Sequence, residues 1–374
     1  MPGRTPRLKL SPHLKNILLV FFLLFPTVKA SCECGFVIND TQDYYTHLIH
    51  NNFSAFSPTK PLSTNPKFTR DWAIQKWGLP VMNWATPLPI LNRPENVYLE
   101  DGHLTLRQEG YPKESVLSAE IVSVASIASR ASNILHGSFR ANMVMENASG
   151  GSVAGFFWYH VCIPSIKLEI LYNSADQLVC KQDDKNEIDI EILTREFKQD
   201  SMLVHYTTHP ALDDRGWLIS NATEIISLNG DRPSESFQVH RFDWTKEELR
   251  FYQNADVVHT NTIRVPTDEG SVYLNLWADG GMWSGSPSTT DVYLRVKYLS
   301  IYHNTSASEN GTDSVFNQRC QKAGGLTTAT VCYDVHINSG LQIPSSKSKS
   351  LTPLPLWALS IFCLGLTIIM IAML

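Results

Sequence analysis

Three acidic residues at alternate positions form the most reactive pattern in the chain. Glu187, Asp189 and Glu191 are separated by single isoleucines, so in a strand the carboxylates share one face and the isoleucines share the other. Like charges at this spacing repel one another and raise their pKa values, which costs stability unless a function compensates. The row therefore favours a reaction centre over its alternative, an exposed acidic edge that keeps strands from pairing.

Cleavage of a glycosidic bond is the chemistry that such a row suits. The reaction needs one ionised and one protonated carboxyl group, and a third carboxylate between them can share a proton and hold their pKa values apart. Retention of the anomeric configuration requires the two reactive groups to lie about 5–5.5 Å apart. Cα atoms four residues apart in a strand are separated by about 13 Å, so we expect the two glutamates to lean together on a curved sheet.

The elements that must position this row are strands. Alternating segments follow one another from residue 97 to residue 303, and helical periodicity of useful length is confined to the two ends of the chain. The segments that we expect to be strands are 97–106, folded around Asp101-Gly102, and 138–145, 152–159, 187–193, 237–244, 249–252, 272–277 and 293–302. Many strands without intervening helices predict an all-β fold, an antiparallel β-sandwich or jelly roll.

Several of these segments resemble those of glycoside hydrolase family 16. The acidic row is similar to the E-[hydrophobic]-D-x-E signature of that family, with no extra residue between Asp189 and Glu191. Residues 136–141, 237–244 and 274–277, the last followed by Trp283, resemble further family motifs in the same order. The resemblance covers roughly residues 68–303 and implies a concanavalin A-like jelly roll and an anomer-retaining double displacement. We expect no cofactor and no metal among the site residues, and the sequence leaves open whether a structural calcium is bound.

The resemblance also implies a role for each site residue. Glu187 would be the nucleophile, Glu191 would protonate the leaving oxygen and then activate the acceptor, and Asp189 would tune the pair. The candidates for contact with the sugar are Trp158, Trp277, Trp283, His205 and His209. For the tryptophans the alternative is core packing, and for the histidines it is a structural role.

The function that follows is hydrolysis of a β-glucan with 1,3 or mixed 1,3-1,4 linkages, in carbohydrate metabolism or cell-wall remodelling. The alternatives are a cell-wall transglycosylase, which transfers the sugar to another sugar hydroxyl, and a carbohydrate-binding protein without catalysis. The long insert at 162–185 and the hairpin at 253–256 depart from the family pattern. These two departures leave open which glucan linkage the protein would cleave.

The two ends of the chain resemble targeting signals. Residues 1–30 have a basic start and an apolar run, which is typical of a signal peptide cleaved before Ser31, with a membrane anchor as the alternative. Residues 353–374 form an apolar tail behind a polar, serine-rich stretch, which is typical of a signal for a glycolipid (GPI) anchor, with a membrane helix as the alternative. We therefore expect a secreted, cell-surface protein of the fungal wall type, with an extension at 31–67, the family domain at 68–305 and a stalk at 306–352.

The cysteines also suit a secreted protein. Six remain when Cys363 is assigned to the tail, an even number that suits disulfides in an oxidising compartment. Nearness in the sequence favours the pairs Cys162–Cys180 and Cys320–Cys332, since Cys32 and Cys34 lie too close for an easy mutual bridge. Glycosylation sequons, which also suit a secreted protein, begin at Asn39, Asn52, Asn147, Asn221, Asn304 and Asn310.

The charge of the chain argues against a nucleic-acid partner. The chain has 31 basic and 36 acidic residues, but five of the basic residues lie among the first 30 and two follow Gly340. The stretch between them therefore has a formal net charge of −12, whereas the phosphates of a nucleic acid select a basic surface. We expect a monomer whose partner is a polysaccharide.

Overall fold

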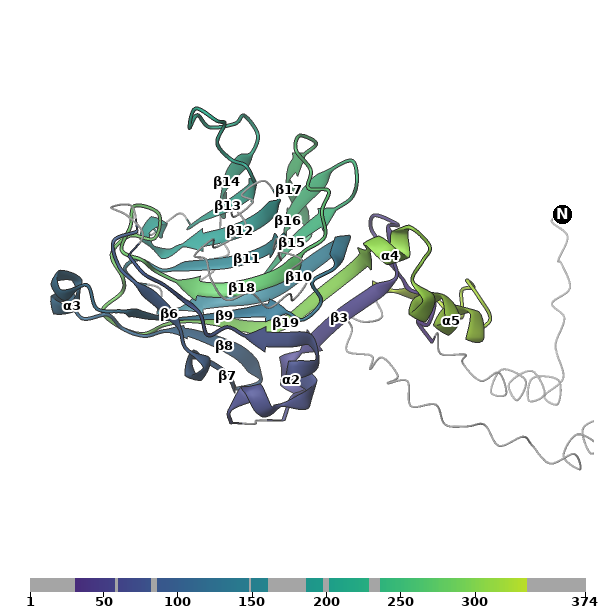
Figure 1. The fold of residues 1–374 in the computed structure, drawn as a ribbon, viewed down its shortest axis with the longest axis horizontal. Coiled ribbons are helices and arrows are strands. Elements are labelled where there is room, and N and C mark those ends of the chain that lie inside the picture. Colours follow the sequence, from purple (N-terminus) through teal and green to yellow (C-terminus); the bar gives the residue numbers. More distant parts are fainter. Residues whose placement is uncertain are drawn as a thin grey trace, which may run out of the picture. The chain divides into compact units, whose positions relative to one another are not determined.

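Two large, mostly antiparallel sheets face each other across a shared apolar core (Figure 1). The computed structural model describes residues 31–57, 60–81, 86–147, 149–160, 186–197, 202–228 and 236–334. All of these residues belong to one unit of the chain. The predicted fold class, an all-β sandwich, is confirmed.

The sheet that contains the acidic row is called the β12 sheet here. Its strands, in spatial order, are β14 (Thr223–Leu228), β13 (Met202–Thr208), β12 (Glu187–Leu193), β11 (Val153–Tyr159), β18 (Ser271–Trp277), β9 (Val122–Ser129), β6 (Ile90–Asn92) and β5 (Gly78–Leu79). The short strand β4 (Trp72–Ile74) also pairs with β9. The pairing of β6 with β9 is parallel, while the strands on either side of β12 are antiparallel to it.

The opposite sheet is called the β10 sheet. Its strands, in spatial order, are β17 (Asp256–Asn261), β16 (Leu249–Gln253), β15 (Gln238–Trp244), β10 (Ile134–Glu146), β19 (Val292–Thr305), β8 (His103–Gln108) and β7 (Val97–Glu100). Strand β3 (His47–Asn52) pairs with β19 as well. The expected hairpin turn between β7 and β8 is present, with both Asp101 and Gly102 at positive φ.

The core between the sheets is built from the inward residues of each strand. Ile188, Ile190 and Ile192 of β12 are buried in it. The rings of Phe139 and Phe242 stack in the β10 sheet with centroids 4.4 Å apart. Burial of each large apolar side chain stabilises a fold by about 1.5–3 kcal/mol, so the isoleucine face of β12 fixes which way its other face points.

Short helices connect the strands and lie beyond them. The 3₁₀ turns are η1 (Phe53–Ala55), η2 (Leu62–Thr64), η3 (Pro94–Asn96) and η4 (Thr194–Glu196), and the α-helices are α2 (Pro66–Asp71), α3 (Lys113–Ser118), α4 (Ser306–Glu309) and α5 (Ser314–Lys322). Asp313 caps α5 by accepting a hydrogen bond from the Phe316 amide. The longest of these helices, α5, has nine residues, so the described helices are too short to give a clear period in the sequence.

A small third sheet joins the N-terminal and C-terminal parts of the described chain. Strands β1 (Phe36–Val37), β2 (Tyr44–Tyr45) and β20 (Cys332–Tyr333) form it, and β1 runs parallel to β20. Hence the stretch 31–67 reaches both this sheet and, through β3, the β10 sheet.

The disulfides follow this pairing and not nearness in the sequence. They join Cys32 to Cys332 and Cys34 to Cys320, with Cα atoms 4.9 and 4.5 Å apart. The expected pair of Cys320 with Cys332 is wrong because β1 pairs with β20, which brings Cys32 to Cys332 and Cys34 to Cys320. Cys162 and Cys180 lie outside the described residues.

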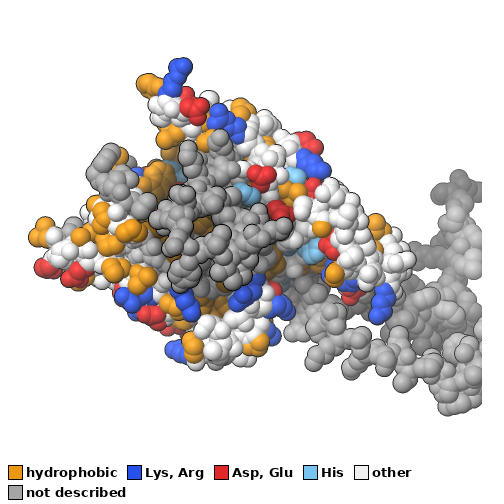
Figure 2. Space-filling model, viewed as in Figure 1, with side chains coloured by type: hydrophobic (Ala, Val, Ile, Leu, Met, Phe, Trp, Pro, Cys, Tyr) orange, Lys and Arg blue, Asp and Glu red, His pale blue; other side chains and the backbone are white. Residues whose placement is uncertain are grey.

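The expected signal peptide and apolar tail also lie outside the described residues. Among the residues that the structure describes, no helix is both long enough and apolar enough to span a bilayer. On the face shown in Figure 2, acidic and basic side chains are dispersed, and hydrophobic side chains gather toward the end that carries α3.

Paired replacement tests the disulfide assignment. The double variant Cys34→Ala/Cys320→Ala should lower the free energy of unfolding by about 2–5 kcal/mol, because the bond restricts the unfolded chain. Urea unfolding of the oxidised proteins measures this. Peptide mapping without reduction should yield linked peptides for Cys32–Cys332 and Cys34–Cys320, and a peptide that links Cys320 to Cys332 would contradict the assignment.

Candidate active site

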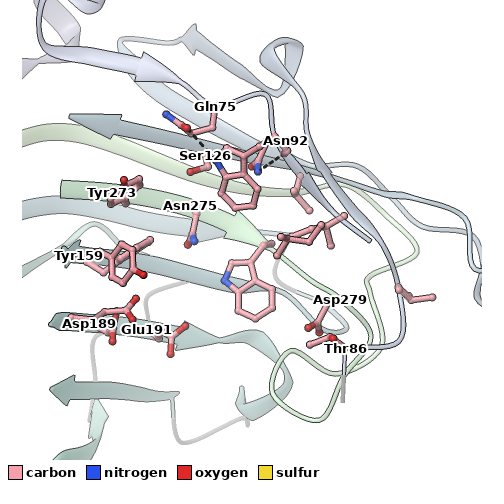
Figure 3. A pocket seen from close by; sticks show the side chains of 18 of the residues that line it. Gln75, Thr86, Asn92, Ser126, Tyr159, Asp189, Glu191, Tyr273, Asn275 and Asp279 are labelled. Atoms are coloured by element: carbon pink, nitrogen blue, oxygen red, sulfur yellow. Dashed lines mark hydrogen bonds between the residues drawn. The ribbon is translucent and has the colours of Figure 1, made fainter. Parts of the chain in front are cut away.

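Strand β12 presents its three carboxylates to a cleft on the outer face of the sheet. The alternation predicted from the sequence is confirmed: the isoleucines are buried in the core, while Glu187, Asp189 and Glu191 line the cleft. Asp189 is only 5% exposed, and the two glutamates are half-buried. Figure 3 shows Asp189 and Glu191 side by side on this strand.

Neighbouring strands supply the rest of this face because their register matches that of β12. On β11, Gly155 lies opposite Glu191, Phe157 opposite Asp189 and Tyr159 opposite Glu187. A Cβ atom at Gly155 would lie 2.5 Å from the Asn275 Oδ1 atom. That oxygen accepts a hydrogen bond from the Gly155 amide at 3.0 Å, so the glycine allows a polar side chain of β18 to lie close to the acidic strand.

The cleft has a volume of about 510 Å³ and crosses several strands. It is lined by Gln75, Trp77, Leu79, Pro80, Thr86, Leu88, Ile90, Asn92, Val124, Ser126, Phe157, Tyr159, the three carboxylates, Tyr273, Asn275, Trp277 and Asp279. Aromatic rings and a few polar groups along one wall are the surface that a sugar chain requires, since rings pack on sugar faces and amides bond to hydroxyls.

Burial changes the acidity of two of the carboxyl groups. Burial raises the pKa of Asp189 well above its ordinary value, and the charge of Glu191 adds to this, while a hydrogen bond with Glu187 opposes it. Burial raises the pKa of Glu191 to about 7, with a further increase from Glu187, while a hydrogen bond from Trp283 and the nearby His209 oppose it. Glu191 therefore keeps a proton near neutral pH, as a general acid must.

The two predicted histidines lie on or just beyond β13. His205 is opposite Glu191 in the sheet and is buried, with its Nε2 atom 2.6 Å from the Glu196 Oε2 atom. His209 follows β13, and its Nε2 atom lies 2.9 Å from the Asp189 Oδ2 atom. Both histidines thus adjoin the acidic row, His205 from the side and His209 directly.

The three predicted tryptophans have different positions. Trp277 lines the cleft, and Trp283 is 39% exposed and meets the His205 ring edge-to-face with centroids 5.0 Å apart. Trp158 is fully buried and donates a hydrogen bond to the Ile134 carbonyl. The prediction that Trp158 contacts sugar is wrong, because in β11 it has the parity of the core residue Phe156 and packs on Trp244 with ring centroids 4.4 Å apart.

Several cleft residues were not singled out from the sequence. Phe157 and Tyr273 stack with ring centroids 5.0 Å apart, and Figure 3 shows Tyr159, Tyr273 and Asn275 on the same face as the acidic pair. Counting by twos along 153–159 and 271–277 could have found these residues, because each strand alternates between core and cleft. Gln75 and Trp77 come from a distant segment, and no local pattern indicates them.

A single metal ion could in principle be bound by Glu187, Asp189 and His209, which lie close together. One ligand atom from each lies within 4.8 Å of the others. Metal ligands must be deprotonated, whereas burial favours the protonated form of Asp189. Burial therefore opposes metal binding at Asp189, and the three groups are close enough to share a proton.

Comparison with known proteins agrees with this combination of an all-β sandwich and an acidic cleft. The model of the glycosyl hydrolases family 16 matches residues 90–295, which is more than half of the chain. The chain belongs to this family.

Individual relatives match only part of this chain, at low sequence identity. A β-glucanase of Bacillus licheniformis is 28% identical over 103 residues, which cover 27% of this chain and 38% of the relative. A β-glucanase of Paenibacillus polymyxa is 30% identical over 103 residues, or 27% and 39% of the two chains. The matched part is thus less than half the length of these relatives. A solved structure of the Bacillus licheniformis β-glucanase covers 68% of this chain and 97% of its own, with a TM-score of 0.46 and 20% identity.

The raised pKa of Glu191 predicts a stability effect that depends on pH. The unfolded carboxyl ionises near pH 4.5 but the folded one near pH 7, so the wild type loses stability as the pH rises between these values and stays lower above them. Glu191→Gln should therefore be more stable than the wild type at pH 8, by about 3 kcal/mol, and equal to it at pH 4.

Urea unfolding at a series of pH values measures this difference. The matched control is Glu247→Gln, which changes an exposed glutamate and should leave the pH dependence as it is. A Glu191→Gln difference that is the same at pH 4 and pH 8 would refute the buried-acid assignment.

Proposed function

We propose that this protein is a retaining glycoside hydrolase that cleaves β-glucan by double displacement. The observation that carries the proposal is the row of three carboxyl groups in one cleft, of which Glu191 has a pKa of about 7. A protonated acid and a second carboxyl group on the same face are the two groups that the reaction needs. Membership of family 16 supports the same chemistry.

The strand provides a role for each group. Glu187 attacks the anomeric carbon and forms a glycosyl ester while Glu191 gives its proton to the departing oxygen. Glu191 then takes a proton from water, which attacks the anomeric carbon and releases the sugar from Glu187. Asp189 shares a hydrogen bond with Glu187 and adjoins His209, so it can hold a proton between the two reactive groups as their charges change.

The substrate class follows from the cleft and from the relatives. Aromatic side chains and amides along β11, β18 and the 75–77 segment suit a polymer of sugars, and the relatives named above are β-glucanases. We propose a β-glucan with 1,3 or mixed 1,3-1,4 linkages. A protein that only binds carbohydrate is disfavoured, because it would lose stability by burying carboxyl groups and gain nothing from their raised pKa values.

The wild-type protein should release oligosaccharides from laminarin or lichenan with the β-configuration retained. Proton NMR of the first products shows the anomer, and labelled acceptor oligosaccharides show whether sugar is transferred to another sugar and not to water. Release of α-products would contradict double displacement, and products found only on the acceptor would favour a transglycosylase.

Variants of the two glutamates test the roles. Glu187→Gln should lose several orders of magnitude in kcat because no ester can form. Glu191→Gln should lose about 10²–10⁴-fold, and less on substrates whose leaving group needs no proton. Azide should rescue Glu187→Ala as the α-glycosyl azide and Glu191→Ala as the β-glycosyl azide. The opposite anomers would mean that the nucleophile and the acid are exchanged.

We also propose that the protein is secreted and held at the cell surface by a glycolipid, as a wall-remodelling enzyme of the fungal type. The support is the sequence alone: the patterns at 1–30 and 338–374, and the six sequons. Two disulfides suit the same oxidising route.

A phospholipase specific for glycolipid anchors should therefore release the protein from intact cells. Western blotting of the supernatant measures the release, and mass spectrometry should find that the mature chain begins near Ser31. A membrane form that keeps the peptide ending in Leu374 would exclude the anchor.

A further inference from the structure

Asp279 is a fourth carboxyl group in the cleft, and the proposed reaction does not use it. It comes two residues after the end of β18, whose Asn275 and Trp277 line the same cleft. Figure 3 shows Asp279 across the cleft from the acidic pair of β12. Asp279 is only 7% exposed, and burial of a carboxyl group costs stability unless hydrogen bonds replace those with water. We therefore expect each of its oxygens to need a donor.

The first carboxyl oxygen, Oδ1, is held by its own loop. It accepts hydrogen bonds from the Ser284 hydroxyl at 2.7 Å and from the Gly281 amide at 2.9 Å. The backbone is held as well, because the Asp279 carbonyl accepts a hydrogen bond from the Leu88 amide at 2.9 Å. Gly280 has a φ of +74°, and a Cβ atom there would lie 2.7 Å from the Leu88 Cδ1 atom. The side chain is thus fixed before any ligand binds, which lowers the entropy cost of binding.

The second carboxyl oxygen, Oδ2, has no such partner. No described residue donates a hydrogen bond to it, and it is not a buried atom. Since Asp279 lines the cleft, this oxygen is open to a ligand there. A carboxylate oxygen can accept two hydrogen bonds. The cleft therefore holds an acceptor whose position is set by the protein and which no described residue occupies.

The charge of the cleft indicates which donor fits this oxygen. The charged side chains among the described lining residues are all acidic: Glu187, Asp189, Glu191 and Asp279. A polymer that carries carboxylate or sulfate groups would be repelled, whereas a sugar hydroxyl donates to a carboxylate in a short, charge-assisted hydrogen bond. Trp277, two residues before Asp279, adds an aromatic ring of the kind that packs on a sugar face. The fitting ligand is a neutral sugar.

Asp279 also lies away from the reacting bond. Gly155 of β11 pairs with Glu191 on one side and with Asn275 on the other, so Asn275 is in line with the general acid. Asp279 follows four residues later, and four residues of extended chain span up to about 13 Å. A sugar unit bonded by Asp279 is therefore not the unit whose bond is cleaved.

We propose that Asp279 is a substrate-binding residue whose Oδ2 atom accepts a hydrogen bond from a hydroxyl group of a neutral sugar unit beyond the reacting one. The inference deepens the proposed function, because it rests on a β-glucan chain lying in the cleft. It gives the site a preference for chain length. A glucan long enough to reach the 279–285 loop gains the contact, and a shorter one does not.

Calorimetric titration of the Glu187→Gln protein, which cannot turn the substrate over, tests this with linear 1,3 and mixed-linkage glucan oligosaccharides from disaccharide to hexasaccharide. Affinity should rise along the series. Asp279→Asn keeps the oxygen that Ser284 and Gly281 bond and replaces Oδ2 with a donor. Added to Glu187→Gln, it should weaken binding of the hexasaccharide about tenfold and leave binding of the disaccharide unchanged.

The matched control is Asp256→Asn, which changes an exposed aspartate on β17 of the β10 sheet and should leave every affinity as it is. Circular dichroism checks that each variant is folded. Equal hexasaccharide binding with and without Asp279→Asn overturns the proposal, and so does an equal loss at every length or no binding of any oligosaccharide by the parent protein.

The proposed function is tested separately, by turnover of the wild type. Length-dependent binding that requires Asp279, in a protein that cleaves no glucan, would refute the proposed function and support this inference. Cleavage of glucan in a protein whose binding does not depend on Asp279 would do the reverse.

Discussion

The alternation along β12 is the constraint on which the rest of the structure depends. The same seven residues give isoleucines to the core and carboxyl groups to the cleft. Burial of each isoleucine stabilises the fold by about 1.5–3 kcal/mol. Raising the pKa of Glu191 from 4.5 to about 7 costs about 3 kcal/mol. The apolar face is therefore large enough to hold the acidic face in place, and a slip of one residue would exchange the two faces.

This alternation is also what the sequence reveals best. A period of two is local, so the strands, the all-β class and the shared face of Glu187, Asp189 and Glu191 could be predicted before any contact was known. The same period distinguishes Trp277 from Trp158. Trp277 pairs with Val153 on β11, and Val153 has the same parity as Gly155, which lies on the cleft face. Trp158 falls on the other face. Residue type alone suggested a sugar contact for both, and parity would have excluded one of them.

Contacts between distant segments could not be predicted in this way. Cys32 and Cys332 are 300 residues apart, and they meet because a two-residue strand pairs in parallel with another. Trp77 enters the cleft from a segment more than 100 residues before the acidic strand. The contact of Trp283 with His205 depends on where the 279–285 loop lies over β13. None of these contacts leaves a periodic signal, because each depends on the register of strands that come together only in the folded chain.

The middle carboxyl group explains how three acids can share one strand. Asp189 is the most deeply buried of the three, and its pKa is raised well above the ordinary value, so burial favours its neutral form. A neutral group between Glu187 and Glu191 removes the nearest negative charge from both. Glu187 can then carry the charge that a nucleophile needs while Glu191 keeps its proton. Equal burial of all three groups would prevent catalysis. Because burial is greatest at the central residue, it gives the three groups different roles.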